Sequence, residues 1–137
     1  MRVRYAALPV LVATAVSVAA PATAQPPVLH QVRYTVTANA PSFADIYYRD
    51  TEPATFSDYS HNPYEFSPRA EVDVAPDRPW VMEARLANPD LWAMVLVQSG
   101  ETRMFDTAGF TCELAVDGVV VKTNSGPRGA LCSIRNW

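Results

Sequence analysis

The chain has 137 residues, of which 49% are hydrophobic and 18% charged, and its formal net charge at pH 7 is −3. This length suits a single domain with a modest core. An acidic balance without a basic stripe argues against nucleic acid and anionic lipid as partners.

The N-terminal segment has the features of a secretory signal peptide. Arg2 and Arg4 precede an apolar run from Tyr5 to Ala20, and the small residues Ala22-Thr23-Ala24 follow. We therefore predict a signal peptide over residues 1–24, with cleavage after Ala24. The alternative is an uncleaved anchor, for which about 20 apolar residues are needed. Cleavage predicts a secreted or cell-envelope protein that contacts the membrane only if this segment is kept.

The remaining residues 25–137 carry 9 basic and 14 acidic side chains, a formal charge of −5. Residues 25–29 are predicted to be a flexible linker, and residues 30–137 a single domain. Within this domain apolar residues recur with a period of two, as in Val32, Tyr34 and Val36, which is typical of half-buried strands. The predicted strands cover residues 32–36, 44–48, 70–74, 80–86, 91–97, 110–116, 119–123 and 130–134.

Three of these segments carry more specific signals. Residues 91–97 are apolar throughout, which predicts a central strand covered on both faces. Asp117-Gly118 separates two apolar strands, and this pair predicts a type I′ hairpin because both turn residues need a positive φ. Residues 124–129 are predicted to form a loop before the last strand. The twelve prolines leave no room for a long helix.

Seven to nine short strands in this length predict an all-β fold, a small antiparallel Ig-like β-sandwich with one disulfide. An exported chain with two cysteines favours the bridge Cys112–Cys132, which stabilises the domain by about 3 kcal/mol in the loop-entropy model. In a simple meander these residues would lie two strands apart, about 9.6 Å, too far for a disulfide. The final strand should therefore lie beside residues 110–116 or across from them, and not beside 119–123.

Residues 49–68 interrupt the strand pattern with a polar and aromatic segment. Long segments of weak periodicity inside compact domains are usually functional loops or poorly ordered ones, and aromatic side chains on loops are frequent binding anchors. The candidate binding residues are Phe56, Tyr59, His61, Tyr64 and Phe66. The alternative is that Phe56 and Phe66 merely pack the loop onto the sandwich.

The sequence carries no recognisable catalytic or metal-binding pattern. Its two histidines, His30 and His61, lack zinc- or calcium-ligand spacing, and no Gly-x-Ser-x-Gly motif is present. Glu71 and Asp73 share one strand face, as on any solvated strand. We therefore expect a protein that is not an enzyme and has no metal or cofactor. A deep pocket that gathers His61 with buried carboxylates would favour a hydrolase instead.

The three tryptophans differ in their expected roles. Trp80 is predicted to lie in the core, close to the disulfide if the sandwich follows the immunoglobulin pattern. Trp92 is predicted to begin the central strand. Trp137 either packs against the last strand or is exposed as an anchor, and the sequence leaves both open.

The order of these elements resembles the soluble domain of the mycobacterial membrane protein small (MmpS) family, over roughly residues 30–135. The residues that carry the resemblance are Val32-x-Tyr34-x-Val36-Thr37, Ala44-Asp45-Ile46-x-Tyr48-x-Asp50, Pro79-Trp80, and Cys112-Glu113-Leu114-Ala115-Val116-Asp117-Gly118-Val119-Val120 with the later Cys132. The C-terminal third is the most specific part.

The resemblance implies an accessory module of the cell envelope that assists large lipid or siderophore exporters of the RND type. Its partner would be such an envelope protein or an exported lipid. MmpS proteins usually keep their N-terminal segment as a membrane helix, whereas this chain is predicted to lose it. The alternative is therefore a free secreted structural or interaction protein with no transporter partner. No oligomeric state follows from the sequence.

Overall fold

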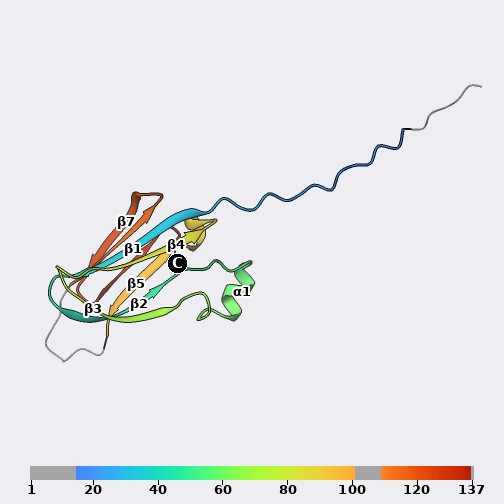
Figure 1. Cartoon of the computed structure of the whole chain (residues 1–137). Coiled ribbons are helices and arrows are strands. Elements are labelled where there is room, and N and C mark those ends of the chain that lie inside the picture. Colours follow the sequence, from blue (N-terminus) through green and yellow to red (C-terminus); the bar gives the residue numbers. More distant parts are fainter. Residues whose placement is uncertain (1–14, 101–108, 137) are drawn as a thin grey trace, which may run out of the picture.

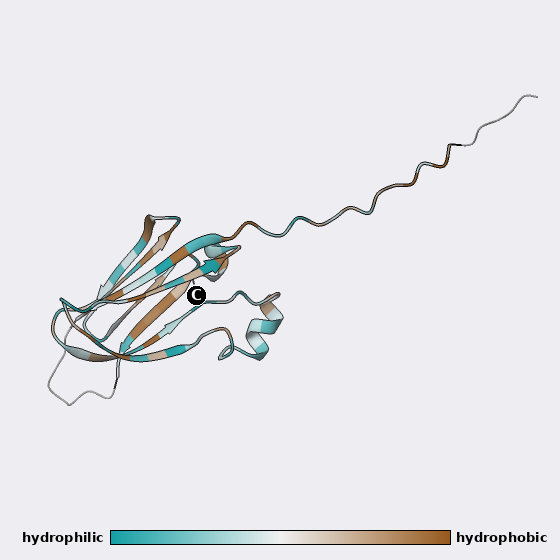
Figure 2. Cartoon of the chain, in the orientation of Figure 1, coloured by the Kyte–Doolittle hydropathy of each residue, from teal (hydrophilic) through white to brown (hydrophobic). Residues whose placement is uncertain are grey.

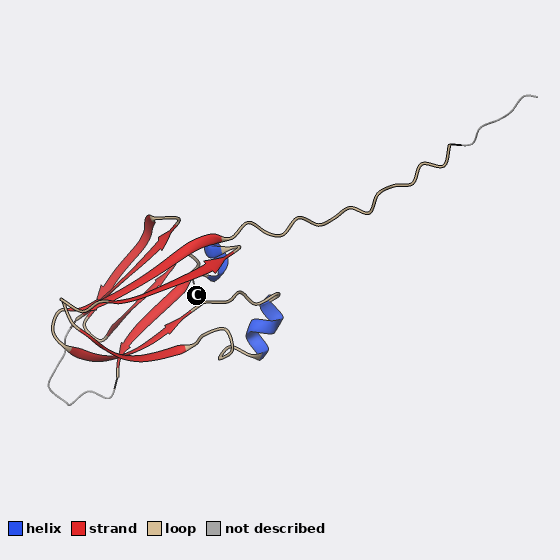
Figure 3. Cartoon of the chain, in the orientation of Figure 1, coloured by secondary structure: helices blue, strands red, loops and turns tan. Residues whose placement is uncertain are grey.

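A computed structural model describes residues 15–100 and 109–136 of the chain. In these residues almost all regular structure is strand, with two short helices (Figure 3). Residues 15–29 have no regular structure and extend away from the folded part (Figure 1). Within the described residues no helix is long and apolar enough to cross a membrane.

Eight strands in the described residues form two antiparallel four-stranded sheets that face each other (Figure 1). The first sheet has the order β4 (Trp80–Leu86), β1 (His30–Ala38), β6 (Phe110–Val116), β7 (Val119–Gly126). The second has the order β3 (Arg69–Val74), β2 (Ser42–Tyr48), β5 (Met94–Ser99), β8 (Gly129–Ser133). The predicted all-β antiparallel sandwich is confirmed.

The core lies between the sheets and comes from the inward-facing half of each strand. In β1 the alternating Val32, Tyr34 and Val36 are fully buried, as their spacing predicts. The other large fully buried apolar side chains on the strands are Ile46, Val74, Leu86, Val95, Val97, Phe110 and Leu114. Figure 2 shows the hydrophobic colour of β5 at the centre of the sandwich. Burial of these side chains provides the main stabilisation of the fold.

The disulfide Cys112–Cys132 joins β6 of the first sheet to β8 of the second, with both cysteines buried and a Cα–Cα distance of 6.0 Å. β8 pairs with β5. The final strand thus lies across from residues 110–116, in the other sheet, and the prediction from bridge geometry is confirmed.

The hairpin at Asp117-Gly118 also forms as predicted, because both residues have a positive φ, 50° and 81°. The predicted loop 124–129 is wrong in its extent. β7 continues to Gly126 and β8 begins at Gly129, so only Pro127 and Arg128 connect these two strands, which belong to different sheets. A Cβ at Gly126 would collide with the carbonyl oxygen of Gly129, so glycine permits this tight crossing.

The predicted strand 91–97 is only partly correct. Residues Pro89–Trp92 form the short helix α2, which starts with proline in its first turn, a position that suits its fixed φ. The strand begins at Met94, and it is central in its sheet, between β2 and β8. Val95 and Val97 are buried, whereas Met94 and Leu96 are only partly covered on the outer face.

Two of the tryptophans can be placed. Trp80 lies on the edge strand β4, is partly buried and packs against Tyr48 with ring centroids 5.2 Å apart. Val36 is paired with both Trp80 and Cys112, so one strand separates Trp80 from the disulfide. Trp92 is buried at the end of α2 and does not begin a strand. Trp137 is outside the described residues.

Candidate functional site

The segment from Arg49 to Pro68 connects β2 to β3 at one end of the sandwich and contains α1 (Phe56–His61) (Figure 1). Thr55 caps this helix: its side chain accepts a hydrogen bond from the Asp58 backbone N–H, and the Asp58 carboxylate accepts one from the Thr55 backbone N–H. This reciprocal capping box stabilises a helix start. It gives local order to a segment that the sequence pattern left without regular structure.

Arg49 fixes the base of this segment. In the sequence it continues the polar half of the alternation of Asp45 and Tyr47, a pattern that predicts exposure. Its side chain is fully buried. Nε donates a hydrogen bond to the Trp92 carbonyl at 2.8 Å, and Nη1 donates to the Phe66 carbonyl at 3.1 Å. A buried charge is tolerated only with such compensation. Arg49 therefore connects the start of the segment to its end and to α2.

Two aromatic rings cover the Arg49 guanidinium. Cζ lies 4.6 Å from the centroid of the Tyr59 ring and 5.4 Å from that of Trp92. These rings also contact each other edge to face, with centroids 5.7 Å apart. Cation–π attraction is strongest in desolvated positions such as this one. The contacts hold α1 against the body of the sandwich.

Tyr34 supports the same region from the core. Its hydroxyl donates to the Arg49 carbonyl at 2.6 Å and accepts from the Met94 N–H at 3.4 Å. Burial raises the pKa of Tyr34, because the charged phenolate is disfavoured away from water. Tyr34 therefore stays a neutral hydrogen-bond donor at physiological pH.

The five candidate binding residues divide into two groups. Tyr59 and Phe66 are partly buried and are both linked to Arg49. Phe56 and Tyr64 have exposed fractions of 55% and 87%. His61 is also exposed, and its Nδ1 donates to the Ser57 carbonyl at 2.7 Å. The alternative prediction is that Phe56 and Phe66 pack the loop onto the sandwich. Phe66 is partly buried and Phe56 is exposed, whereas Tyr59 is the candidate residue that packs against the core.

Arg49 and Trp92 are the residues of this region that sequence reasoning missed. Arg49 occupies a polar position of a two-residue alternation, which predicts exposure. Trp92 lies in the apolar run 91–97, which predicts a strand. The available signal was an arginine at the end of a strand, directly before an aromatic-rich segment. That signal alone does not identify which carbonyls and rings would cover the guanidinium.

His30, the other histidine, lies far from His61 in the chain and contacts the tip of the β6–β7 hairpin. Its Nδ1 lies 2.6 Å from Asp117 Oδ2, and the Gln31 N–H donates to Asp117 Oδ1 at 2.9 Å. These two hydrogen bonds, first that from His30, hold the pKa of Asp117 below its usual value. Both side chains are substantially exposed, so this pair fixes the start of the domain to a hairpin rather than forming a buried site.

Across residues 15–100 and 109–136, no three His, Cys, Asp or Glu side chains gather closely enough to hold a metal ion. Glu71 and Asp73 are exposed, as their strand face predicts, and Glu71 pairs with Arg69 at 2.6 Å. The region around Arg49 contains aromatic rings, a buried cation and backbone carbonyls. This arrangement can position exposed side chains rigidly. On α1 the Ser57 hydroxyl lies 3.3 Å from His61 Nδ1, with both side chains exposed.

Comparison with known proteins places the fold in a family. The model of the Rv2576c β-sandwich domain matches residues 34–132. The uncharacterized protein Rv2576c of Mycobacterium tuberculosis is 37% identical over 111 residues, which cover 81% of this chain and 70% of the relative. The uncharacterized protein Mb2606c of Mycobacterium bovis matches with the same identity and coverage. The chain therefore belongs to the Rv2576c β-sandwich domain family.

Proposed function

We propose that this chain is an exported, non-catalytic binding or accessory module of the mycobacterial cell envelope, similar to the MmpS partners of RND-type lipid and siderophore exporters. The observation that carries the proposal is the rigid mounting of exposed aromatic side chains. Phe56 and Tyr64 are exposed on a segment that begins at the buried Arg49, and the Arg49 side chain also binds the Phe66 carbonyl near the other end of the segment. Aromatic side chains held in this way bind partners at a low entropic cost.

Other features support export and an envelope location. The signal-like N-terminus leads into a domain with a disulfide between its sheets, and such bridges persist in oxidising compartments outside the cytoplasm. The relatives with 37% identity are mycobacterial proteins. The resemblance to MmpS in the Cys112 to Cys132 region supplies the class of partner.

Chemical crosslinking of the full chain in the native envelope, followed by capture and mass spectrometry, tests this function. We expect the wild-type chain to capture an RND-type exporter. Tyr64→Ser and Phe56→Ser should each reduce the captured amount at least fivefold, because both remove exposed aromatic area. Val81→Ser, at an exposed position on the edge strand β4, is the matched control and should capture normally. Capture of no exporter, or equal capture by all variants, would contradict the proposal.

The second candidate is a free secreted structural or interaction protein without a transporter partner, favoured by the Ala22-Thr23-Ala24 cleavage pattern. Tethering raises the effective concentration of a domain at its partner, and cleavage removes that advantage. Mass spectrometry of the mature N-terminus separates the two. A chain that starts at Gln25 favours the free protein, and one that retains Arg2 favours the membrane-bound accessory role.

A further inference from the structure

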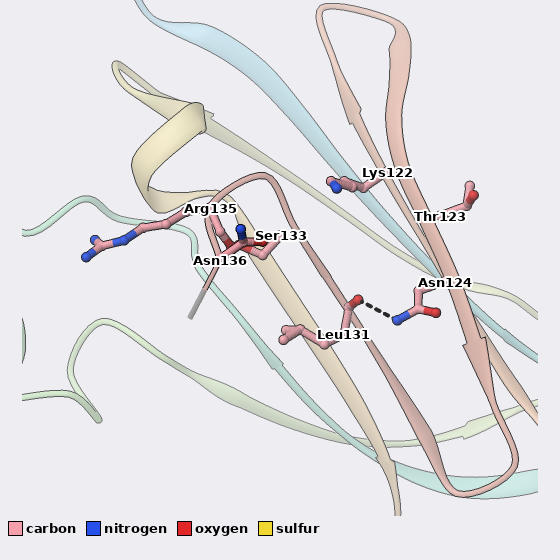
Figure 4. A pocket seen from close by; sticks show the side chains of 7 residues that line it. All are labelled: Lys122, Thr123, Asn124, Leu131, Ser133, Arg135 and Asn136. Carbon is pink, nitrogen blue, oxygen red and sulfur yellow. Dashed lines mark hydrogen bonds between the residues drawn. The ribbon is translucent and has the colours of Figure 1, made fainter.

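A groove of about 350 Å³ lies between β7, at the edge of the first sheet, and β8, at the edge of the second (Figure 4). On one side it is lined by Lys122, Thr123 and Asn124, and on the other by Leu131 and Ser133. At its end Arg135 extends toward α1, where the guanidinium lies over the Phe56 ring. β7 and β8 diverge from the short connection that joins them (Figure 4), so that both edges border the same groove.

The backbone of Leu131 faces this groove. The Ser99 N–H donates to the Arg128 carbonyl at 3.0 Å, and in an antiparallel ladder the bonded pairs alternate with unbonded ones. Because Arg128 is bonded to Ser99, the next residues of β8 that bond to β5 are Ala130 and Cys132. The N–H and carbonyl of Leu131, which lies between them, therefore point to the outer edge of β8. The Leu131 carbonyl accepts a hydrogen bond from Asn124 Nδ2 at 3.1 Å (Figure 4).

The first sheet extends beyond the second at this edge. In the register of β6 and β7, Asn124 lies opposite Cys112 and Lys122 opposite Leu114, so both share the inner face with the buried side chains of β6. Yet every residue of β7 from Val119 to Ser125 is exposed. A strand added beside β8 would therefore cover the inner face of β7.

The charges at this edge differ from those at the other edges. Lys122, the only lysine of the chain, and Arg135 are the charged residues that line the groove. The edge strand β3 carries both signs of charge, with Arg69, Glu71 and Asp73, and so does β4, with Glu83 and Arg85. Charged side chains on edge strands discourage pairing with another chain. In an acidic domain, a groove lined by basic residues favours an acidic guest.

We propose that this groove binds an extended, acidic segment of a protein partner, which adds to β8 as a fifth strand of the second sheet. Strand addition of this kind takes its affinity from main-chain hydrogen bonds and its specificity from side-chain pockets. The guest bonds to the N–H and carbonyl of Leu131, replacing the side chain of Asn124, while its carboxylates lie near Lys122 and Arg135. The site does not depend on what Phe56 and Tyr64 bind.

Nuclear magnetic resonance titration of the full ¹⁵N-labelled chain tests the site. The probe is a blocked heptapeptide in which Val alternates with Glu and Thr, and the comparison peptide has Lys in place of Glu. We expect saturable shifts of the backbone amides of Leu131, Ser133 and Lys122, with at least tenfold tighter binding of the acidic peptide at low salt. Absence of shifts, equal binding of both peptides, or shifts centred on β3 or β4 would overturn the proposal.

Two variants locate the interaction. Lys122→Glu should weaken the acidic peptide at least fivefold, whereas Arg85→Glu, the same charge reversal on the opposite edge strand β4, should leave it unchanged. Leu131→Pro removes an outward N–H without removing a bond to β5, and should abolish binding. Melting curves monitor folding, and if Leu131→Pro unfolds, Lys122→Glu decides. Concentration-dependent shifts at Leu131 without peptide would mean that a second copy fills the groove, which also overturns the proposal.

Discussion

The guanidinium of Arg49 lies 4.6 Å from the centre of the Tyr59 ring, at the end of β2 and wholly out of contact with solvent. Through this contact a residue at the end of a strand determines where α1 rests. The same guanidinium donates to the carbonyls of Phe66 and Trp92, which lie 17 and 43 residues further along the chain. The segment from Arg49 to Pro68 is therefore ordered where it joins the sandwich rather than at its exposed residues.

Arg49→Met should lower the free energy of unfolding by about 2–4 kcal/mol, because a buried and a partly buried carbonyl lose charge-assisted hydrogen bonds. Urea denaturation measures the loss, and limited proteolysis should show faster cleavage within residues 50–67. Arg85→Met, at an exposed position on β4, is the control and should stay within about 0.5 kcal/mol of the wild type. Unchanged stability of Arg49→Met would show that Arg49 does not hold the segment.

Tyr59→Ala and Tyr64→Ala should have opposite consequences, although both residues belong to the same predicted loop. Tyr59 contacts Arg49, Trp92 and Phe56, so its truncation should cost about 1–3 kcal/mol of stability. Tyr64 is 87% exposed, and its truncation should change stability by less than about 0.5 kcal/mol. Equal melting temperatures for the two variants would contradict this division.

Most of the strands could be predicted from the sequence because a two-residue period is a local property. Val32, Tyr34 and Val36 have the spacing of one sheet face, and they are buried on one face. The crossing of the last strand also followed from the sequence, because the reach of a disulfide excludes a meander. These inferences needed no knowledge of distant contacts except the bridge itself.

Arg49 shows why the site could not be predicted in the same way. A polar position in an alternating strand normally faces water. Whether an arginine can be buried there depends on carbonyls and rings brought in by remote segments, here those of Phe66 and Trp92. Trp92 itself was misplaced because an apolar run does not distinguish a buried strand from a short helix.

Replacing both Cys112 and Cys132 by Ala should lower the free energy of unfolding by about 3 kcal/mol, the loop-entropy contribution of a bridge of this sequence separation. The unreduced wild-type chain should show no reactive thiol in denaturant, and the reduced chain should show two. Intact masses before and after reduction under denaturing conditions should differ by two hydrogens. Free thiols in the unreduced chain would contradict the bridge.

Gly126→Ala should destabilise the protein more than Gly118→Ala, because the two glycines are needed for different reasons. Gly118 has a φ of 81° with open space around it, so a methyl group adds only backbone strain of about 1 kcal/mol. At Gly126 the added Cβ would collide with the backbone carbonyl of Gly129, and such overpacking costs about 2–3 kcal/mol. Thermal unfolding of the two variants in parallel checks the order.

The free energy of unfolding should fall in acid as the Asp117 carboxylate is protonated. Its pKa is held below the ordinary value of 3.8 by hydrogen bonds from His30 and from the Gln31 backbone. A carboxyl whose pKa is lower in the folded state contributes stability above its unfolded pKa and loses it as pH falls through the folded pKa. Asp117→Asn keeps a residue that tolerates a positive φ. It should be less stable than the wild type at pH 5.5, and the difference should decrease as the pH falls and the carboxyl is protonated. Because the pair is exposed, 1 M NaCl should shrink the difference at pH 5.5. Urea denaturation at pH 5.5 and at pH 2 measures the difference, and a difference that does not decrease between them would contradict the assignment to this carboxylate. In a carboxyl ¹³C titration, His30→Gln should raise the pKa of Asp117.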